Sequence, residues 1–238
     1  MRKIKRIIRL LALIGVYVLS AYSYMFAKGF VYNGERFELS NVANASTSTS
    51  LSIPVDAQIK ISSQLNRAFG SEQAPLTMYS YSSFDCSHCE DFHRFIYPKI
   101  ERDFVKTNKL RFVFISLPST PISMQATKLL YCAPSDKYHN FVNQLFQKKN
   151  WRFASDNKLL NKEASLIGMS ENDIIKCNND KKLTSDILLM RENAINEIGI
   201  KSTPSFIIEG KSGKELIVGA RKYEDIKEYL EKRIKENR

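Results

Sequence analysis

A pair of cysteines two residues apart, at the junction of a predicted strand and a predicted helix, constrains the fold of this chain more than any other feature. Residues 75–83, PLTMYSYSS, are rich in β-branched and aromatic residues and predict the strand. After Cys86 and Cys89, apolar residues recur at helical spacing, namely Phe92, Phe95, Ile96, Ile100 and Phe104. The aromatic residues among them, Phe92, Phe95 and Phe104, are expected in the core. Cys86 should therefore lie where the strand turns into a helix, which Pro98 should kink because it removes a backbone donor.

The remaining predicted elements place this junction in an α/β fold. Residues 109–118 predict a second strand, and residues 121–198 show helical patterns without a strand signal. Residues 204–210 and 214–220 then predict a hairpin, and a last amphipathic helix runs over 223–238. A strand, a helix and a strand imply a parallel pair with a right-handed crossover, to which the hairpin adds antiparallel edges. The helical block should pack as a lid or subdomain.

The position of the cysteines suits thiol chemistry. A thiol attacks a disulfide only as the thiolate, so a reactive site must lower its pKa. Cys86 at a helix start meets unpaired backbone N–H groups and the positive end of the helix dipole. His88, between the cysteines, is a further candidate for stabilising the thiolate, as an imidazolium or an N–H donor. Cys89, one turn into the helix, should be shielded and within disulfide reach of Cys86.

The stretch GSEQAPLTMYSYSSFDCSHC, followed at a distance by GIKSTPSFII, resembles the DsbA-like branch of the thioredoxin superfamily, a group of bacterial thiol-disulfide oxidoreductases. The resemblance covers residues 69–238 and implies a thioredoxin fold with an inserted all-helical subdomain. The 114 residues between Cys89 and Pro204 leave room for that insertion. It also implies that Cys86 is the exposed nucleophile and Cys89 its buried partner. Pro204 would be a cis-proline facing the disulfide, and the backbone of Thr203 would pair with a substrate peptide.

Three positions depart from the best-known members of that branch. The dipeptide between the cysteines is Ser87-His88, where the best-known oxidases carry Pro-His. Thr203 before the proline is more typical of isomerases and reductases. Ser80 stands six residues before Cys86, where relatives often hold a buried acid, which argues against a carboxylate proton relay. Because no dimerising N-terminal domain is evident, we expect an oxidase that acts as a monomer, with a reductase or isomerase of the same fold as the alternative.

The N-terminal residues indicate export. A basic start, MRKIKRIIR, precedes the uncharged apolar run of residues 10–27, which is the layout of a secretory signal and is also long enough for a membrane anchor. Lys and Arg on the N-terminal side would leave that end in the cytoplasm and send the rest across, into the periplasm. A cleaved signal and a retained inner-membrane anchor both stay open.

The chain is divided by these patterns into five parts. They are 1–27, the signal or anchor; 28–68, an N-terminal extension with a polar tether and a short predicted helix over 55–69; 69–120, the first half of the thioredoxin fold; 121–198, the helical insert; and 199–238, the second half with the cis-proline loop.

The formal net charge is +11, and five of the positive residues lie in the first nine. The remaining excess is spread along the chain, which argues against nucleic-acid binding.

Cys132 and Cys177 both lie in the helical block, outside any CxxC pattern. In an exported protein, disulfides persist, so a structural bridge between two helices is the preferred interpretation. A second redox pair and two buried thiols are the alternatives. Some alphaproteobacterial relatives of DsbA resemble this chain in having such a second pair.

Two functions from other classes compete with the redox interpretation. Cys86, Cys89 and His93 have the spacing of three zinc ligands, but no second close pair completes a structural site. A peptide-binding periplasmic protein without redox activity is the other alternative, and the intact CxxC argues against it.

We therefore expect a periplasmic enzyme that introduces disulfides into exported proteins through its CSHC motif. Its substrates would be reduced exported proteins, and a DsbB-like, quinone-linked membrane oxidase would reoxidise it. Neither a metal nor an organic cofactor is required by this chemistry.

Overall fold

The computed structural model describes residues 30–32, 37–39, 52–154 and 156–237, which belong to two compact units divided after Ser50. In the first unit, β1 (Phe30–Tyr32) pairs antiparallel with β2 (Phe37–Leu39). The predicted signal or anchor and nearly all of the polar tether lie outside the described residues. Among the residues described, no helix has the length and apolar character needed to cross a membrane.

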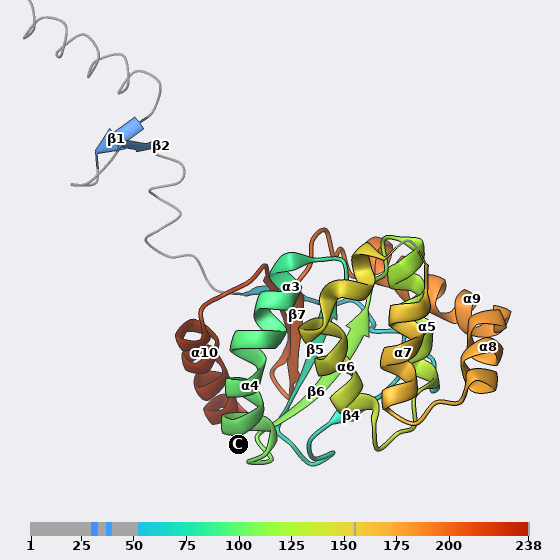
Figure 1. Cartoon of the computed structure of the whole chain (residues 1–238). Coiled ribbons are helices and arrows are strands. Elements are labelled where there is room, and N and C mark those ends of the chain that lie inside the picture. The colour runs from blue at the N-terminus through green and yellow to red at the C-terminus, as the bar shows by residue number, and fades with distance from the viewer. Residues whose placement is uncertain (1–29, 33–36, 40–51, 155, 238) are drawn as a thin grey trace, which may run out of the picture. The chain divides into compact units, whose positions relative to one another are not determined.

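A six-stranded mixed sheet forms the centre of the second unit (Figure 1). Its order is β3-β8-β7-β5-β6-β4. The strands are β3 (Ile53–Val55), β4 (Ala68–Phe69), β5 (Leu76–Ser82), β6 (Leu110–Ser116), β7 (Ser205–Gly210) and β8 (Gly213–Val218). The central β5 is parallel to β6 and antiparallel to β7. The predicted parallel pair and hairpin are therefore both present.

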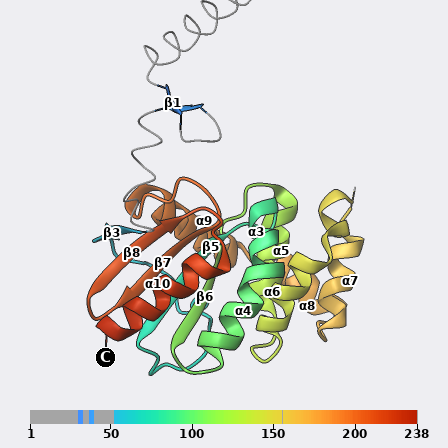
Figure 2. The ribbon, with the colours of Figure 1, turned by 90° about the vertical axis from the view of Figure 1, so that its left-hand side faces the viewer.

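The helix that follows β5 changes its period along its length. It runs as α3 (Ser87–Asp91), a π-helical stretch (Phe92–Ile96), α4 (Tyr97–Ile100) and a second π-helical stretch (Glu101–Val105). It lies beside the C-terminal helix α10 (Tyr223–Glu236) on one face of the sheet (Figure 2). Phe92 of this helix packs against Phe206 of β7, with ring centroids 4.5 Å apart.

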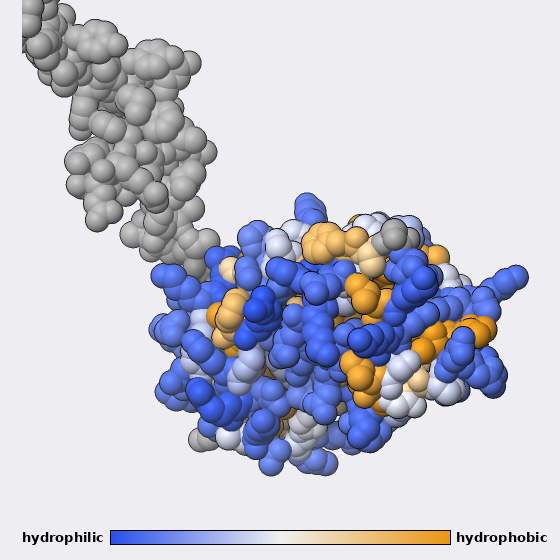
Figure 3. Space-filling model, in the orientation of Figure 1, coloured by the Kyte–Doolittle hydropathy of each residue, from blue (hydrophilic) through white to orange (hydrophobic). Residues whose placement is uncertain are grey.

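The segment between β6 and β7 is helical throughout its regular elements, which confirms the predicted insert. Its helices are α5 (Pro121–Cys132), α6 (Tyr138–Gln147), a 3-10 turn (Lys149–Phe153), α7 (Lys158–Leu166), α8 (Glu171–Asn179), α9 (Lys181–Glu192) and a π-helical end (Asn193–Glu197). Capping boxes begin α5, at Thr120 and Ser123, and α8, at Ser170 and Asp173. On the face that carries α6 and α7, apolar side chains gather among hydrophilic ones (Figure 3).

Two expectations are wrong. No helix forms over residues 55–69; this segment is largely irregular, and it begins at the last residue of the edge strand β3 and ends with the edge strand β4. Because β3 pairs with β8, β8 is not an edge. The edge strand β3 forms because it pairs with β8. The edge strand β4 pairs with β6, where the ring of Phe69 stacks on that of Phe112 with centroids 6.0 Å apart. Phe95 is not in the core but 56% exposed, because the π-helical stretch changes the rotation between residues and breaks the 3.6-residue spacing.

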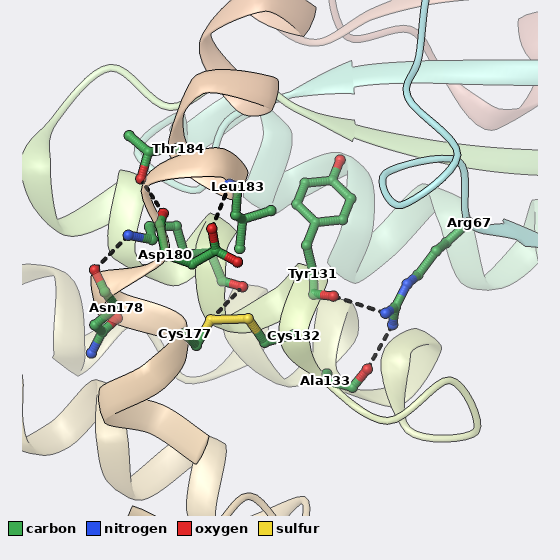
Figure 4. The surroundings of a disulfide bond; sticks show 10 residues. Arg67, Tyr131, Cys132, Ala133, Cys177, Asn178, Asp180, Leu183 and Thr184 are labelled. Carbon is green, nitrogen blue, oxygen red and sulfur yellow. Dashed lines mark hydrogen bonds between the residues drawn. A yellow bond between two sulfur atoms is a disulfide. The ribbon is translucent and has the colours of Figure 1, made fainter. Parts of the chain in front are cut away.

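A disulfide between Cys132 and Cys177 joins the end of α5 to α8, with Cα atoms 6.2 Å apart (Figure 4). Beside it, the guanidinium of Arg67 donates hydrogen bonds to the carbonyl oxygens of Tyr131 and Ala133, at 2.8 and 2.6 Å. The segment before β4 is thus joined to the end of α5 by hydrogen bonds, and α5 is joined to α8 by the disulfide.

Replacing both bridging cysteines, as Cys132→Ser/Cys177→Ser, should lower the free energy of unfolding by about 2–4 kcal/mol, because the unfolded chain is no longer closed into a loop. The sequence separation of 45 residues sets this expectation. Urea denaturation of the variant and the wild type, each with its CxxC reduced, measures the difference. Equal midpoints and slopes for the two proteins would contradict it.

Candidate active site

Cys86 is the N-cap residue of α3, at the end of the turn that follows β5. Its backbone is extended, and its sulfur accepts a hydrogen bond from the backbone N–H of Cys89 at 3.2 Å. An N-cap side chain normally offers an oxygen to these unpaired N–H groups, and here the sulfur takes that place. The half-buried Cys86 and the fully buried Cys89 are both free thiols.

The Thr203–Pro204 loop lies against Cys86, although it is more than a hundred residues away in the sequence. The peptide bond between Thr203 and Pro204 is cis. The Cys86 thiol donates to the carbonyl oxygen of Thr203 at 3.3 Å. This approach follows from the sheet, since β7 begins at Ser205, directly opposite Tyr81 near the end of β5. The structure thus brings together four of the residues that the sequence predicted for the site.

The two cysteines ionise very differently. Hydrogen bonding from the Cys89 side chain, aided by the Thr203 side chain and the backbone N–H groups of Cys89 and His88, outweighs burial and lowers the pKa of Cys86 from 9.0 to about 6. Burial, followed by the hydrogen bond and the charge of Cys86, raises the pKa of Cys89 far above its ordinary range. At neutral pH the pair therefore holds one accessible thiolate and one buried thiol.

His88 is exposed, and its backbone N–H is the group that contributes to the low pKa of Cys86. The role predicted for its imidazole stays a prediction. Ser80 is fully buried and shares a hydrogen bond with Ser82 at 3.1 Å, so the position where relatives often hold an acid is occupied by a hydroxyl pair.

Asp85, which the sequence analysis did not single out, connects the cysteine loop to the start of the helical insert. Its carboxylate accepts hydrogen bonds from the hydroxyls of Ser119 and Thr120, at 2.8 and 2.9 Å. Burial raises the pKa of Asp85, but hydrogen bonds from Ser123, Ser119 and Thr120 outweigh it and leave the pKa below its ordinary value. The acid beside Cys86 is therefore ionised and anchored. Nothing in the local pattern FDC marks this role, because its partners lie 34 and 35 residues away.

A groove of about 260 Å³ opens beside the Cys86 sulfur. Its lining includes Thr203, Arg191 near the end of α9, Ile195 in the π-helical end that follows, and Asp85 and Ser119. A chain lying in this groove would meet both the thiolate and the backbone of Thr203, so the site is open to an extended polypeptide.

His93 does not act as a metal ligand in this arrangement. Its side chain is buried and stacks on Phe146, with centroids 4.1 Å apart, and neither ring nitrogen has a hydrogen-bond partner in the described part of the chain. Among the residues described, no group of three or more His, Cys, Asp and Glu side chains is placed to hold a metal ion. The zinc interpretation of Cys86, Cys89 and His93 therefore gains no support from the geometry.

Comparison with known proteins gives one consistent result. A family model described as thioredoxin matches residues 62–232. The crystal structure of Wolbachia pipientis alpha-DsbA1 superimposes with a TM-score of 0.67 and 27% identity, over 75% of this chain and 94% of that one. The structure of oxidised BdbD from Bacillus subtilis, at 20% identity, gives a TM-score of 0.65 over 77% of this chain and 98% of that one, and supports the fold.

The names of related proteins also refer to disulfide chemistry. Disulfide bond formation protein D of Bacillus subtilis is 23% identical over 175 residues, which are 70% of this chain and 76% of that protein. A Rickettsia felis protein with the provisional name protein-disulfide oxidoreductase is 24% identical over 162 residues, or 66% of this chain. The chain covers only 57% of the length of that Rickettsia relative.

Alkylation of reduced protein by iodoacetamide should show Cys86 reacting with an inflection near pH 6, because only the thiolate reacts. In Cys89→Ala the inflection should move toward 9.0, since the side-chain donor is lost, whereas Cys89→Ser keeps a donor and should stay low. Mass spectrometry of the modified peptide over a pH series measures both. An inflection that is the same in the Ala and Ser variants would contradict the assigned cause.

The free energy of unfolding should fall as the pH is lowered from 6.5 toward 3, on the order of a few kcal/mol, because the unfolded state binds a proton on His93 more readily than the folded state. Burial, with a contribution from His139, lowers the pKa of His93 from 6.5 to about 3. The stabilisation that comes from keeping this side chain neutral is therefore complete above pH 6.5 and is lost progressively as the pH falls toward 3. The variant His93→Phe, which keeps a ring against Phe146, should show a shallower decrease between pH 7 and 5. If urea denaturation gives the same decrease of unfolding free energy with pH for the wild type and for His93→Phe, the prediction is disproved.

Proposed function

Because the chain belongs to the thioredoxin family and has the fold of its DsbA-like members, we propose that it is a protein thiol:disulfide oxidoreductase that works through Cys86 and Cys89. The observation that carries the proposal is the position of the Cys86 sulfur, at a helix start, 3.3 Å from the carbonyl oxygen of Thr203. The lowered pKa of this thiol and the raised pKa of its neighbour agree with a nucleophile and a resolving partner.

The reaction proceeds in two exchanges. A substrate thiolate attacks the Cys86 sulfur of the oxidised protein; a mixed disulfide forms, and Cys89 leaves and takes up a proton. A second substrate thiolate then attacks the substrate sulfur of the mixed disulfide, and Cys86 leaves as a thiolate. The substrate loses two electrons and gains a disulfide, and the protein is left as the dithiol. No metal or organic cofactor takes part.

The substrate segment lies in the groove beside Cys86. Thr203 lines this groove, and an extended peptide would pair with its backbone in the manner of an added strand. The Thr203 carbonyl oxygen already lies 3.3 Å from the sulfur. His88, exposed next to the pair, is proposed to interact with the thiolate when a substrate covers the site.

The direction of transfer that the site favours is oxidation of the substrate. Stabilisation of the Cys86 thiolate favours the reduced form of the protein, which makes its disulfide a stronger oxidant. The substrates are then reduced exported proteins, and a DsbB-like, quinone-linked membrane oxidase restores the disulfide. The basic start and apolar run of residues 1–27 support a periplasmic location, with the segment either cleaved or kept as an anchor.

The proposal is tested by mixing the oxidised protein with reduced, unfolded ribonuclease A and following the return of nuclease activity. The wild type should accelerate disulfide formation stoichiometrically, and Cys86→Ser should abolish the effect. Cys89→Ser cannot form the Cys86–Cys89 disulfide and should also fail to oxidise reduced ribonuclease A. Mixed instead with scrambled, disulfide-containing ribonuclease A, its Cys86 thiolate should open a substrate disulfide and remain bound as a mixed disulfide, because the resolving thiol is missing. The equilibrium of Cys86 and Cys89 with glutathione, measured in parallel, gives the direction.

The control is Cys132→Ser/Cys177→Ser, which removes both sulfurs of the disulfide in the insert and should retain the exchange. Activity that survives in Cys86→Ser would refute the role of the CxxC. A reduction potential near that of cytosolic thioredoxin, about −270 mV, would instead assign the protein as a reductase.

A further inference from the structure

An excess of positive charge surrounds Glu90, the residue after Cys89. The Glu90 side chain is only 7% exposed and contacts Arg94 at 2.8 Å, Arg152 at 3.2 Å and Lys149 at 3.4 Å. Burial raises the pKa of Glu90, but the contacts with Arg94, Arg152 and Lys149 outweigh it and keep the pKa below its ordinary value. One carboxylate therefore faces three cations, and the cluster carries an uncompensated positive charge.

A cavity of about 420 Å³ adjoins this cluster and is itself basic. Its lining includes the four cations Arg94, Lys148, Lys149 and Lys162. Its one acid, Glu163, is already engaged by Gln144 and by Lys148, the latter at 3.3 Å. The cavity therefore has room and charge for an anion.

The neighbouring Arg152 has unused donor capacity. Its side chain is only 8% exposed, and its Nε and Nη2 atoms have no hydrogen-bond partner within the described residues. A buried guanidinium normally has its donors satisfied, because each unpaired donor costs free energy. Arg152 does not itself line the basic cavity, but it shares the Glu90 carboxylate with Arg94 and Lys149, which do.

Large exposed apolar side chains are neighbours of these cations in the sequence or in the cavity lining. Phe153, next to Arg152, is 81% exposed, and Phe95, whose ring lies 5.2 Å from the Arg94 guanidinium, is 56% exposed. On α7, Leu159 and Leu166 are 45% and 60% exposed and share one side of the helix with Lys162, at i, i+3 and i+7. Figure 3 shows apolar groups among hydrophilic ones on the face over α6 and α7. We call Arg94, Phe95, Lys149, Phe153, Leu159 and Lys162 the basic–apolar face.

This face is separate from the proposed substrate groove. The groove beside Cys86 and the basic cavity have no lining residue in common. An exposed apolar patch of this kind marks an interaction surface. Mixed with lysine and arginine, it has the composition of surfaces that lie in the interface of a bilayer, where cations meet lipid phosphates and Phe and Leu enter the acyl boundary.

We propose that the basic–apolar face docks on a bilayer of anionic lipids, with lipid phosphates in the basic cavity and Phe153 and Leu159 in the interface. Charge complementarity carries the choice of an anionic surface, and the exposed Phe and Leu side chains favour lipid over an acidic protein. Glu90 and Arg94 lie on the helical segment that begins at Cys86, so docking holds the redox loop close to the membrane surface. The proposal goes beyond the proposed function and does not depend on thiol exchange.

Amide hydrogen exchange of the full chain tests it, with vesicles of phosphatidylcholine alone or with one third phosphatidylglycerol. Residues 1–9 carry five positive charges and themselves favour phosphatidylglycerol. All variants share this segment, so the decisive comparison is between variants on the same vesicles. The peptides that cover residues 147–166 should gain protection with phosphatidylglycerol, and high salt should remove the gain because it screens the charges. Lys149→Glu/Lys162→Glu should lose that protection, and Phe153→Ser should weaken it.

The matched control is Lys211→Glu/Lys232→Glu, which changes the net charge equally at exposed positions in the β7–β8 turn and on α10, and should keep the protection. Equal protection by both vesicles, or loss in the control as well, would overturn the proposal. Protection that appears with polyglutamate and not with phosphatidylglycerol would overturn it in favour of an acidic polypeptide. Ribonuclease oxidation by the same variants is recorded separately, so a failure of docking and a failure of thiol exchange are distinguishable.

Discussion

The pairing of β7 with β5 is the interaction on which the site depends. Because Ser205 is opposite Tyr81, the loop before β7 is brought level with the turn after β5, and the Thr203 carbonyl oxygen reaches the Cys86 sulfur. A slip of one residue would turn every side chain of β7 to the other face of the sheet and remove Phe206 from its contact with Phe92. The register that builds the core thus also positions the chemistry.

The helical insert is tied to this centre by polar contacts as well as by packing. Asp85 accepts hydrogen bonds from the residues that begin α5, and Glu90 forms an ion pair with Arg152 between α6 and α7. Both acids flank the CxxC in the sequence, one on each side. A movement of the insert would therefore change the positions of these two charges next to Cys86 and Cys89.

The proposed exchange and the proposed membrane docking use successive turns of the helix that follows β5. Its first residues supply N–H groups to the Cys86 sulfur, and the next turn carries Glu90 and Arg94 toward the basic cavity. In the π-helical stretch that begins at Phe92, successive residues rotate around the helix axis by a different angle than in an α-helix. Phe95 therefore faces solvent, while Phe92 and His93 are buried. A departure from α-helical geometry thus creates part of the exposed apolar surface.

The sequence by itself determined the order of the elements, the helical insert and the place of Cys86 at a helix start, because each depends on neighbours within a few residues. It also pointed to the fold through two separated motifs. It did not reveal the edge strands β3 and β4, the exposure of Phe95, the anchoring of Asp85 or the cations around Glu90. Only the tertiary structure decided these, and the ionisation of the two thiols with them, because burial and contacts between distant residues depend on strand register and packing.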